Sequence, residues 1–117
     1  MKTIELISVP VTDQQKSKEF YLKMGLELVR ENPMGNNQIW IQLRFPDGGP
    51  EITLVNWFEK MPAGSLQGII LLSENLDEDI QRLKGNGIKT GKIDQTPWGK
   101  FAAITDPDGN NWNLHQH

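Results

Sequence analysis

Side chains that could bind a transition metal or act as a nucleophile are scarce in this sequence of 117 residues, which has two histidines and no cysteine. The lack of cysteine excludes a disulfide framework, a thiolate zinc site, an iron–sulfur cluster and a cysteine nucleophile. The sequence also lacks a Gly-x-Ser-x-Gly elbow, a phosphate-binding glycine loop followed by Lys-Ser/Thr, and a His-Glu-x-x-His pair. Residue types and spacing therefore identify no catalytic residue.

Both histidines lie at the end of the sequence. His115 has the same parity as Asn111 and Asn113 in a predicted last strand, so these three side chains are expected on one face of that strand. Two interpretations of His115 remain open, a ligand contact and a solvated position near the chain end. We expect His117, the last residue, to be solvated.

Four tryptophans are a generous number for a chain of this length. Trp40 and Gln42 alternate with the apolar residues Ile39, Ile41 and Leu43. If these apolar residues pack on a helix, Trp40 and Gln42 face a cavity on the other side of the strand. Trp98 follows Pro97 in a predicted loop, and Trp112 is expected in the core or in a dimer contact. Aromatic rings and amides suit a flat, partly polar organic ligand, although each tryptophan taken singly is also compatible with ordinary packing.

The composition excludes two classes of partner. Lysine and arginine number 12 and aspartate and glutamate 15, so the formal net charge is −3, and no basic stripe indicates nucleic acid. The longest uninterrupted apolar run, residues 69–72, is far too short to span a bilayer, and the N-terminus lacks the long apolar segment of a secretory signal. We therefore expect a cytoplasmic protein that binds neither nucleic acid nor membrane.

Apolar alternation and turn residues predict the same order of elements twice: one strand, one helix and three further strands. The first helix is expected to start at a cap provided by Thr12 or Asp13 and to end at Gly25, and the second to start at one of residues 73–75. Strands are predicted over residues 4–11, 26–31, 38–45 and 51–57 in the first half, and over residues 68–72, 88–93, 100–105 and 111–116 in the second.

Two landmarks recur at nearly the same interval. Gly25-Leu26 matches Gly87-Ile88 at an offset of 87 − 25 = 62, and Pro46-Asp47-Gly48 matches Pro107-Asp108-Gly109 at an offset of 107 − 46 = 61. Nearly equal offsets and the repeated element order indicate an internal duplication. Because no long linker separates the halves, we expect one domain over residues 1–117, with modules of about 1–60 and 61–117.

These paired modules resemble the vicinal oxygen chelate superfamily, which contains glyoxalase I, fosfomycin and bleomycin resistance proteins and extradiol dioxygenases. The resemblance covers nearly the whole chain. It is carried by the turn Asp106-Pro107-Asp108-Gly109-Asn110, by Val9-Pro10-Val11-Thr12-Asp13 followed by Phe20-Tyr21, and by Pro97-Trp98-Gly99. It implies an α+β fold of two βαβββ modules, whose strongly curled mixed sheet forms a cup with the helices outside. It also leads us to expect a homodimer.

In metal-using members of the superfamily, four side chains from the first and fourth strands of each module hold one divalent ion. Counted onto this sequence, the four positions are Leu6, Ile52, Gly68 and Asn113, of which only the last has a donor atom. A slip of one residue in one strand would exchange Ile52 for Glu51, giving one carboxylate and one amide. We therefore expect the cup to hold no metal and no cofactor.

Three functions remain open from the sequence. The first is a metal-free protein that binds a small, partly aromatic molecule, similar to the bleomycin resistance type. The second is a metal-dependent lyase, isomerase or dioxygenase, which rests on the resemblance alone because a fold does not fix a function. The third is an interaction module with a vestigial pocket. For the first, the expected ligand contacts are Trp40, Gln42, Trp98, Asn113 and His115.

Overall fold

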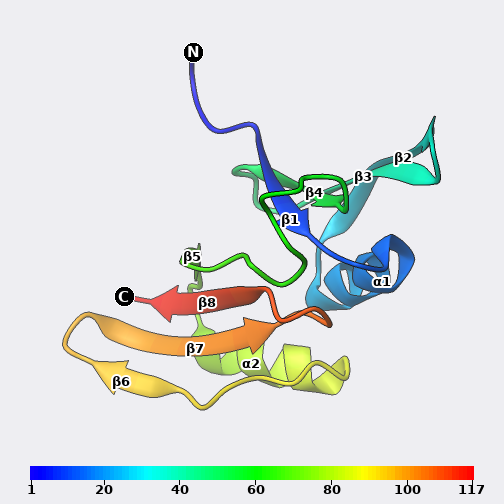
Figure 1. The fold of residues 1–117 in the computed structure, drawn as a ribbon. Helices are drawn as coiled ribbons and strands as arrows, with labels where there is room; N and C mark the ends of the chain where they lie inside the picture. Colours follow the sequence, from blue (N-terminus) through cyan, green and yellow to red (C-terminus); the bar gives the residue numbers. More distant parts are fainter.

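The computed structural model describes residues 1–117 and shows the expected element order twice (Figure 1). Two helices accompany two four-stranded mixed sheets, which confirms the α+β class. The N-terminal sheet has the strand order β1-β4-β3-β2, and the C-terminal sheet has the order β5-β8-β7-β6. The elements are β1 (Leu6–Pro10), α1 (Gln14–Met24), β2 (Glu27–Gly35), β3 (Gln38–Arg44), β4 (Glu51–Val55), β5 (Ile69–Leu72), α2 (Leu76–Gly85), β6 (Asp94–Thr96), β7 (Gly99–Thr105) and β8 (Asn111–Gln116).

Local capping signals set the helix ends. The Asp13 carboxylate accepts hydrogen bonds from the Gln15 and Lys16 amides, both at 3.1 Å, so it satisfies two free donors of the first turn. Gly25 ends α1 with φ +116°, a conformation that side chains disfavour. Asn75 caps α2 by accepting from the amide of Glu78 at 3.1 Å. The predicted starts of both helices and the end of the first are confirmed.

The two sheets are built alike. In each one, the first strand runs parallel to the last strand of its half, and the remaining pairs are antiparallel. Helix α1 packs on β3 and β4, and helix α2 packs on β7 and β8. Each sheet thus has one face covered by its own helix. We call the opposite face of each sheet its open face.

A single core joins the two halves. Seventeen buried apolar residues form one cluster that includes Tyr21 and Ile41 from the first half and Leu83 and Trp112 from the second. Phe45, beyond β3, lies edge-on to Trp112 with ring centroids 6.4 Å apart. The cluster therefore fixes the halves against each other through their helix-covered sides.

The Asp-Pro-Asp-Gly-Asn turn before β8 adds a polar link between the halves. The fully buried Asn110 donates to the carbonyl of Pro10 at 2.7 Å and accepts from the amide of Leu66 at 2.9 Å. Asp106 accepts from the amide of Asn110 at 2.9 Å and from the hydroxyl of Tyr21 at 2.8 Å. This turn therefore satisfies polar groups of β1, α1 and the segment that connects the halves.

One predicted strand is wrong. Residues 88–93 form no strand, and the short β6 lies further along, at Asp94–Thr96. Ile88 is buried in the core, Thr90 makes an isolated bridge to Ile104, and the amide of Gly91 donates to the carbonyl of Ala103 at 2.7 Å. Apolar residues here serve core packing in an extended segment, and a short apolar run does not distinguish such a segment from a strand.

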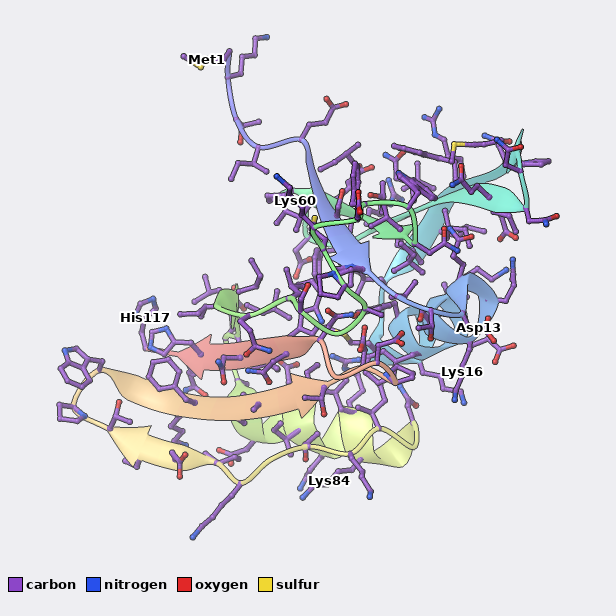
Figure 2. The ribbon with its side chains drawn as sticks, viewed as in Figure 1. Met1, Asp13, Lys16, Lys60, Lys84 and His117 are labelled. Carbon is purple, nitrogen blue, oxygen red and sulfur yellow. The ribbon has the colours of Figure 1, made fainter.

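The termini lie at different sheets (Figures 1 and 2). The segment that begins at Met1 projects from the start of β1, and His117 follows the end of β8. Met1 and Ile4 are exposed. Neither helix has the length and apolar character that crossing a bilayer would need.

Candidate functional site

The open faces display side chains that alternate with the buried ones. On the N-terminal sheet, strand register places Trp40, Gln42 and Glu51 on the open face, while Ile41 and Ile52 are fully buried on the helix side. The open face of the C-terminal sheet, by the same reasoning, carries Ile70, Leu72, Phe101, Ala103, Asn113 and His115.

Three side chains of the N-terminal sheet form a hydrogen-bonded row across its open face. The indole Nε1 of Trp40 donates to Oε1 of Gln42 at 3.0 Å, and Nε2 of Gln42 donates to Oε1 of Glu51. The amide of Gln42 therefore has a fixed orientation, because its oxygen faces the indole and its nitrogen faces the carboxylate. The sequence predicted Trp40 and Gln42 on this face, and Glu51 completes the row.

His115 organises the matching group on the C-terminal sheet. Its ring stacks on Phe101 with centroids 4.3 Å apart and 14° between the planes. Its Nε2 lies 2.8 Å from the carbonyl oxygen of Trp98, in the turn between β6 and β7. The Trp98 indole itself is 76% exposed. His115 thus links the hairpin turn to β8. His117 packs edge-on against the His115 ring, with ring centroids 4.5 Å apart.

The edge strand β5 exposes apolar side chains beside this group. Ile70 and Leu72 are 58% and 71% exposed, and strand register puts them beside Asn113 and His115 respectively. Neighbouring exposed leucine and isoleucine on an unpaired strand edge are unusual on a free protein surface. Nothing in the sequence alone distinguished them from a buried strand, because all four residues of β5 are apolar.

The positions that hold metal in relatives are partly reassigned by the structure. The assignment of Ile52 was wrong, because this residue is fully buried on the helix side. Glu51 takes its place and pairs with Leu6. The assignment of Gly68 was also wrong. In the first half Leu6 pairs with Glu51, and the equivalent pair in the second half is Ile70 with Asn113. The four positions are thus Leu6, Glu51, Ile70 and Asn113, with one carboxylate, one amide and two hydrocarbons. This donor set does not fit a four-ligand metal site.

The predicted site residues therefore form two groups. Trp40 and Gln42 lie on the N-terminal sheet, whereas Asn113 and His115 lie on the C-terminal sheet and Trp98 lies in its β6–β7 turn. No strand of one sheet pairs with a strand of the other, and no hydrogen bond or ring pair joins the two groups. Within one chain the structure thus assembles each group separately.

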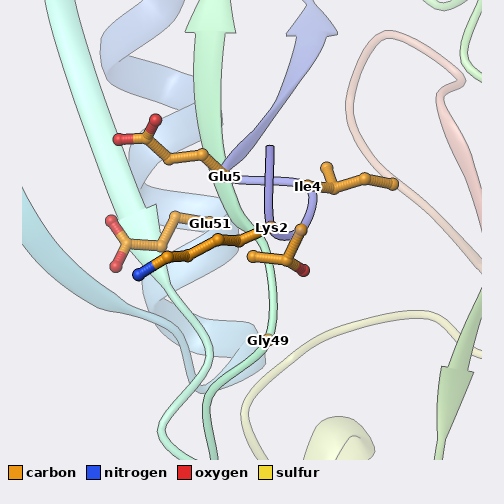
Figure 3. A pocket seen from close by; sticks show the side chains of 6 residues that line it. Lys2, Ile4, Glu5, Gly49 and Glu51 are labelled. Atoms are coloured by element: carbon orange, nitrogen blue, oxygen red, sulfur yellow. The ribbon is translucent and has the colours of Figure 1, made fainter.

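Two hollows border these faces. The smaller, of about 460 Å³, lies between the N-terminal segment and the start of β4 and is lined by Lys2, Thr3, Ile4, Glu5, Gly49 and Glu51 (Figure 3). The larger, of about 1010 Å³, is a groove between the halves, with β5 and α2 on one side and the β3–β4 connection on the other. The smaller hollow borders the row of Trp40, Gln42 and Glu51, because Glu51 belongs to both.

Two ionisable groups outside these faces have shifted pKa values. Burial, with the neighbouring Asp106 carboxylate, raises the pKa of Tyr21 far above its ordinary value. Hydrogen bonds from Lys18 and Gln15, each at 2.8 Å, lower the pKa of Glu31. Both groups belong to the packing of α1 and not to the open faces.

Comparison with known proteins gives a consistent result. Residues 3–114 match the family model of the Glyoxalase/Bleomycin resistance protein/Dioxygenase superfamily. The chain is 33% identical over 121 residues to the uncharacterized protein YetH of Bacillus subtilis (strain 168), covering 99% of each sequence.

Among solved structures, the chain is similar to TnmS3, an antibiotic binding protein from Streptomyces sp. CB03234. The TM-score is 0.90 and the identity 38%, over 99% of this chain and 96% of that one. A glyoxalase/bleomycin resistance protein from the same organism has a TM-score of 0.85 and 39% identity, over 97% of this chain and 100% of that one. From its sequence and its fold, the chain belongs to the Glyoxalase/Bleomycin resistance protein/Dioxygenase superfamily.

Proposed function

We propose that this protein binds a flat, partly aromatic organic molecule on its open faces, without a metal ion. The observation that carries the proposal is the row of Trp40, Gln42 and Glu51, in which an indole, an amide and a carboxylate lie together on an uncovered sheet face. An aromatic ring provides contact area, and a few fixed polar groups provide orientation. The similarity to an antibiotic binding protein supports the same class of function.

The donor set argues against the metal-dependent alternative. A lyase, isomerase or dioxygenase of the superfamily would need donor atoms at the positions of Leu6 and Ile70, where this chain has hydrocarbon side chains. The only acid among the four positions, Glu51, already accepts a hydrogen bond from Gln42. No specific observation favours catalysis.

We further propose that the binding site is completed in a homodimer. One chain presents its two groups of predicted contacts on separate sheets. Pairing the N-terminal sheet of one copy with the C-terminal sheet of its partner would put Trp40 and Gln42 opposite Asn113 and His115. The exposure of Leu72 on an unpaired strand edge supports such pairing, since association would remove it from water.

Tryptophan fluorescence tests ligand binding directly. Titration with 2-(hydroxymethyl)naphthalene, 7-hydroxyflavone and 9-aminoacridine should give saturable quenching with at least one compound. Trp40→Phe should remove most of that quenching, because Trp40 lies on the open face. Trp57→Phe is the matched control, since this residue follows β4 and lies outside the row, and it should leave the quenching intact. Absence of saturable quenching by all three compounds would contradict the proposed function.

A further inference from the structure

Glu51 is an unpaired carboxylate on the open face of the N-terminal sheet, beside Gln42 and Trp40. Its side chain is half-buried and accepts one hydrogen bond, from Gln42 to Oε1. None of the ion pairs in the structure includes Glu51. Its second oxygen, Oε2, has no hydrogen-bond partner in the protein, and the residue lines the smaller hollow. A carboxylate oxygen in this setting is available to accept a hydrogen bond from a bound molecule.

The row holds this carboxylate in place. The amide of Gln42 cannot turn over without losing its bond from the Trp40 indole, so its nitrogen stays directed at Glu51. An acceptor whose neighbours already fix its position loses little conformational entropy on binding. Because the indole of Trp40 begins the same row, a ring resting on that indole can direct one substituent toward Glu51.

The charges around the hollow favour a positive group. Its lining includes two carboxylates, Glu5 and Glu51, and one ammonium, Lys2, which gives a local sum of 1 − 2 = −1. Figure 3 shows all three side chains extending to the same side of the N-terminal segment. The other unpaired charge of this face, Arg30, lies on the exposed edge strand β2, where water and salt weaken its influence.

We infer that Glu51 makes this protein selective for aromatic ligands that carry a protonated amine or another cationic hydrogen-bond donor. A cationic donor bound to Oε2 would form a charge-assisted hydrogen bond, which is stronger than a neutral one. This inference rests on the proposed function and goes beyond it, since it names the charge of the ligand and the residue that binds the charged group.

Calorimetric titration with three matched naphthalenes tests the inference. The compounds are 2-(aminomethyl)naphthalene, which is protonated at pH 7, the neutral 2-(hydroxymethyl)naphthalene and the anionic 2-naphthoate. We expect the amine to bind about tenfold more tightly than the alcohol, and the anion most weakly. Glu51→Gln keeps the shape of the side chain and removes its charge, so the amine and the alcohol should then bind alike.

Glu27→Gln is the matched control. Glu27 shares the N-terminal sheet but is exposed and already paired with Arg44 at 2.8 Å, so its loss should leave the amine preference unchanged. Circular dichroism and thermal unfolding check that both variants fold.

Three results would overturn the inference while leaving the proposed function standing: equal binding of the three compounds, tightest binding of 2-naphthoate, and an amine preference that survives Glu51→Gln. If none of the compounds binds and none quenches tryptophan fluorescence, the proposed function and the inference fall together.

Discussion

Tyr21 is the residue on which the polar link between the halves converges. Its hydroxyl donates to Asp106 at 2.8 Å and accepts from the indole of Trp112 at 3.0 Å, so the fully buried phenol uses both of its hydrogen-bonding functions. Ionisation would place a second negative charge beside Asp106 in an apolar core. The neutral phenol is therefore the only form that this site accommodates.

Alkaline pH should destabilise the protein through Tyr21. The pKa of Tyr21 is raised in the folded state, so above pH about 10 only the unfolded chain releases this proton. The free energy of unfolding should then fall by about 1.4 kcal/mol per pH unit through this residue. Because the chain has one tyrosine, absorbance at 295 nm reports it alone and should rise only as the protein unfolds.

Tyr21→Phe provides the matched variant for this measurement. It should lower stability at pH 7 by about 1–3 kcal/mol, since Asp106 and Trp112 lose a partner, and remove this part of the pH dependence above pH 10. A tyrosinate signal with a midpoint near 10 in protein that circular dichroism shows to be folded would contradict the expectation.

The β6–β7 hairpin is the element that positions Trp98. Gly99 has φ +119°, and a Cβ built there would lie 2.1 Å from the carbonyl oxygen of Gln116. The backbone of the turn therefore approaches the end of β8 as closely as a glycine allows. This approach brings the carbonyl of Trp98 within hydrogen-bond distance of the His115 ring.

Gly99→Ala should force this hairpin away from β8. We expect a loss of about 2–4 kcal/mol in the free energy of unfolding, from the positive φ and from the clash with backbone. Gly35→Ala is the matched control, because Gly35 also has positive φ, +85°, but open space around it. Urea unfolding should therefore show a clearly smaller loss for the control, and equal losses would contradict the role of the close approach.

At the scale of the whole molecule, the arrangement of exposed apolar groups matters most. The helix-covered sides of both sheets share one core, while β5 leaves Ile70 and Leu72 exposed at an unpaired edge next to the larger groove. A second copy of the chain is the partner that we proposed for this edge.

Leu72→Glu should weaken that association. A carboxylate on an edge strand opposes pairing with another chain, so we expect the dissociation constant of the dimer to rise at least about tenfold. Light scattering over a concentration series measures it. Leu22→Glu, on the exposed side of α1, should leave the dimer intact, and a wild-type chain that is monomeric at micromolar concentration would refute the proposal.

Local signals allowed much of this fold to be predicted from the sequence. Asp13 and Gly25 are caps that act within one turn of α1, and strand parity correctly put Trp40 and Ile41 on opposite faces of β3. The prediction of a strand from Ile88 to Ile93 failed, because the apolar residues of this segment pack on a core that only the tertiary structure defines.

Counting from the metal-using relatives failed at two of the four positions, Ile52 and Gly68, for a different reason. Gly68 failed because the spacing from strand to helix cap differs: four residues separate Ser8 from Asp13, and two separate Leu72 from Asn75. Ile52 failed because the spacing from turn to strand differs: the position lies three residues after Gly48 but four after Gly109. The row that ends at Glu51 depends on side-chain contacts, and no sequence pattern reports these.

The segment that connects the halves, residues 56–68, is fastened to both of them at Gly64 and Leu66. The amide of Gly64 donates to the carbonyl of Pro10 at 3.1 Å, and the amide of Asn111 donates to the carbonyl of Leu66 at 3.0 Å. A Cβ on Gly64 would lie 2.2 Å from the carbonyl oxygen of Asp108. These contacts hold the connection against both halves, so we expect the proposed dimer to form from whole folded chains without exchange of halves. Self-association should accordingly be rapid, reversible and free of the slow kinetic trapping that accompanies swapped assemblies.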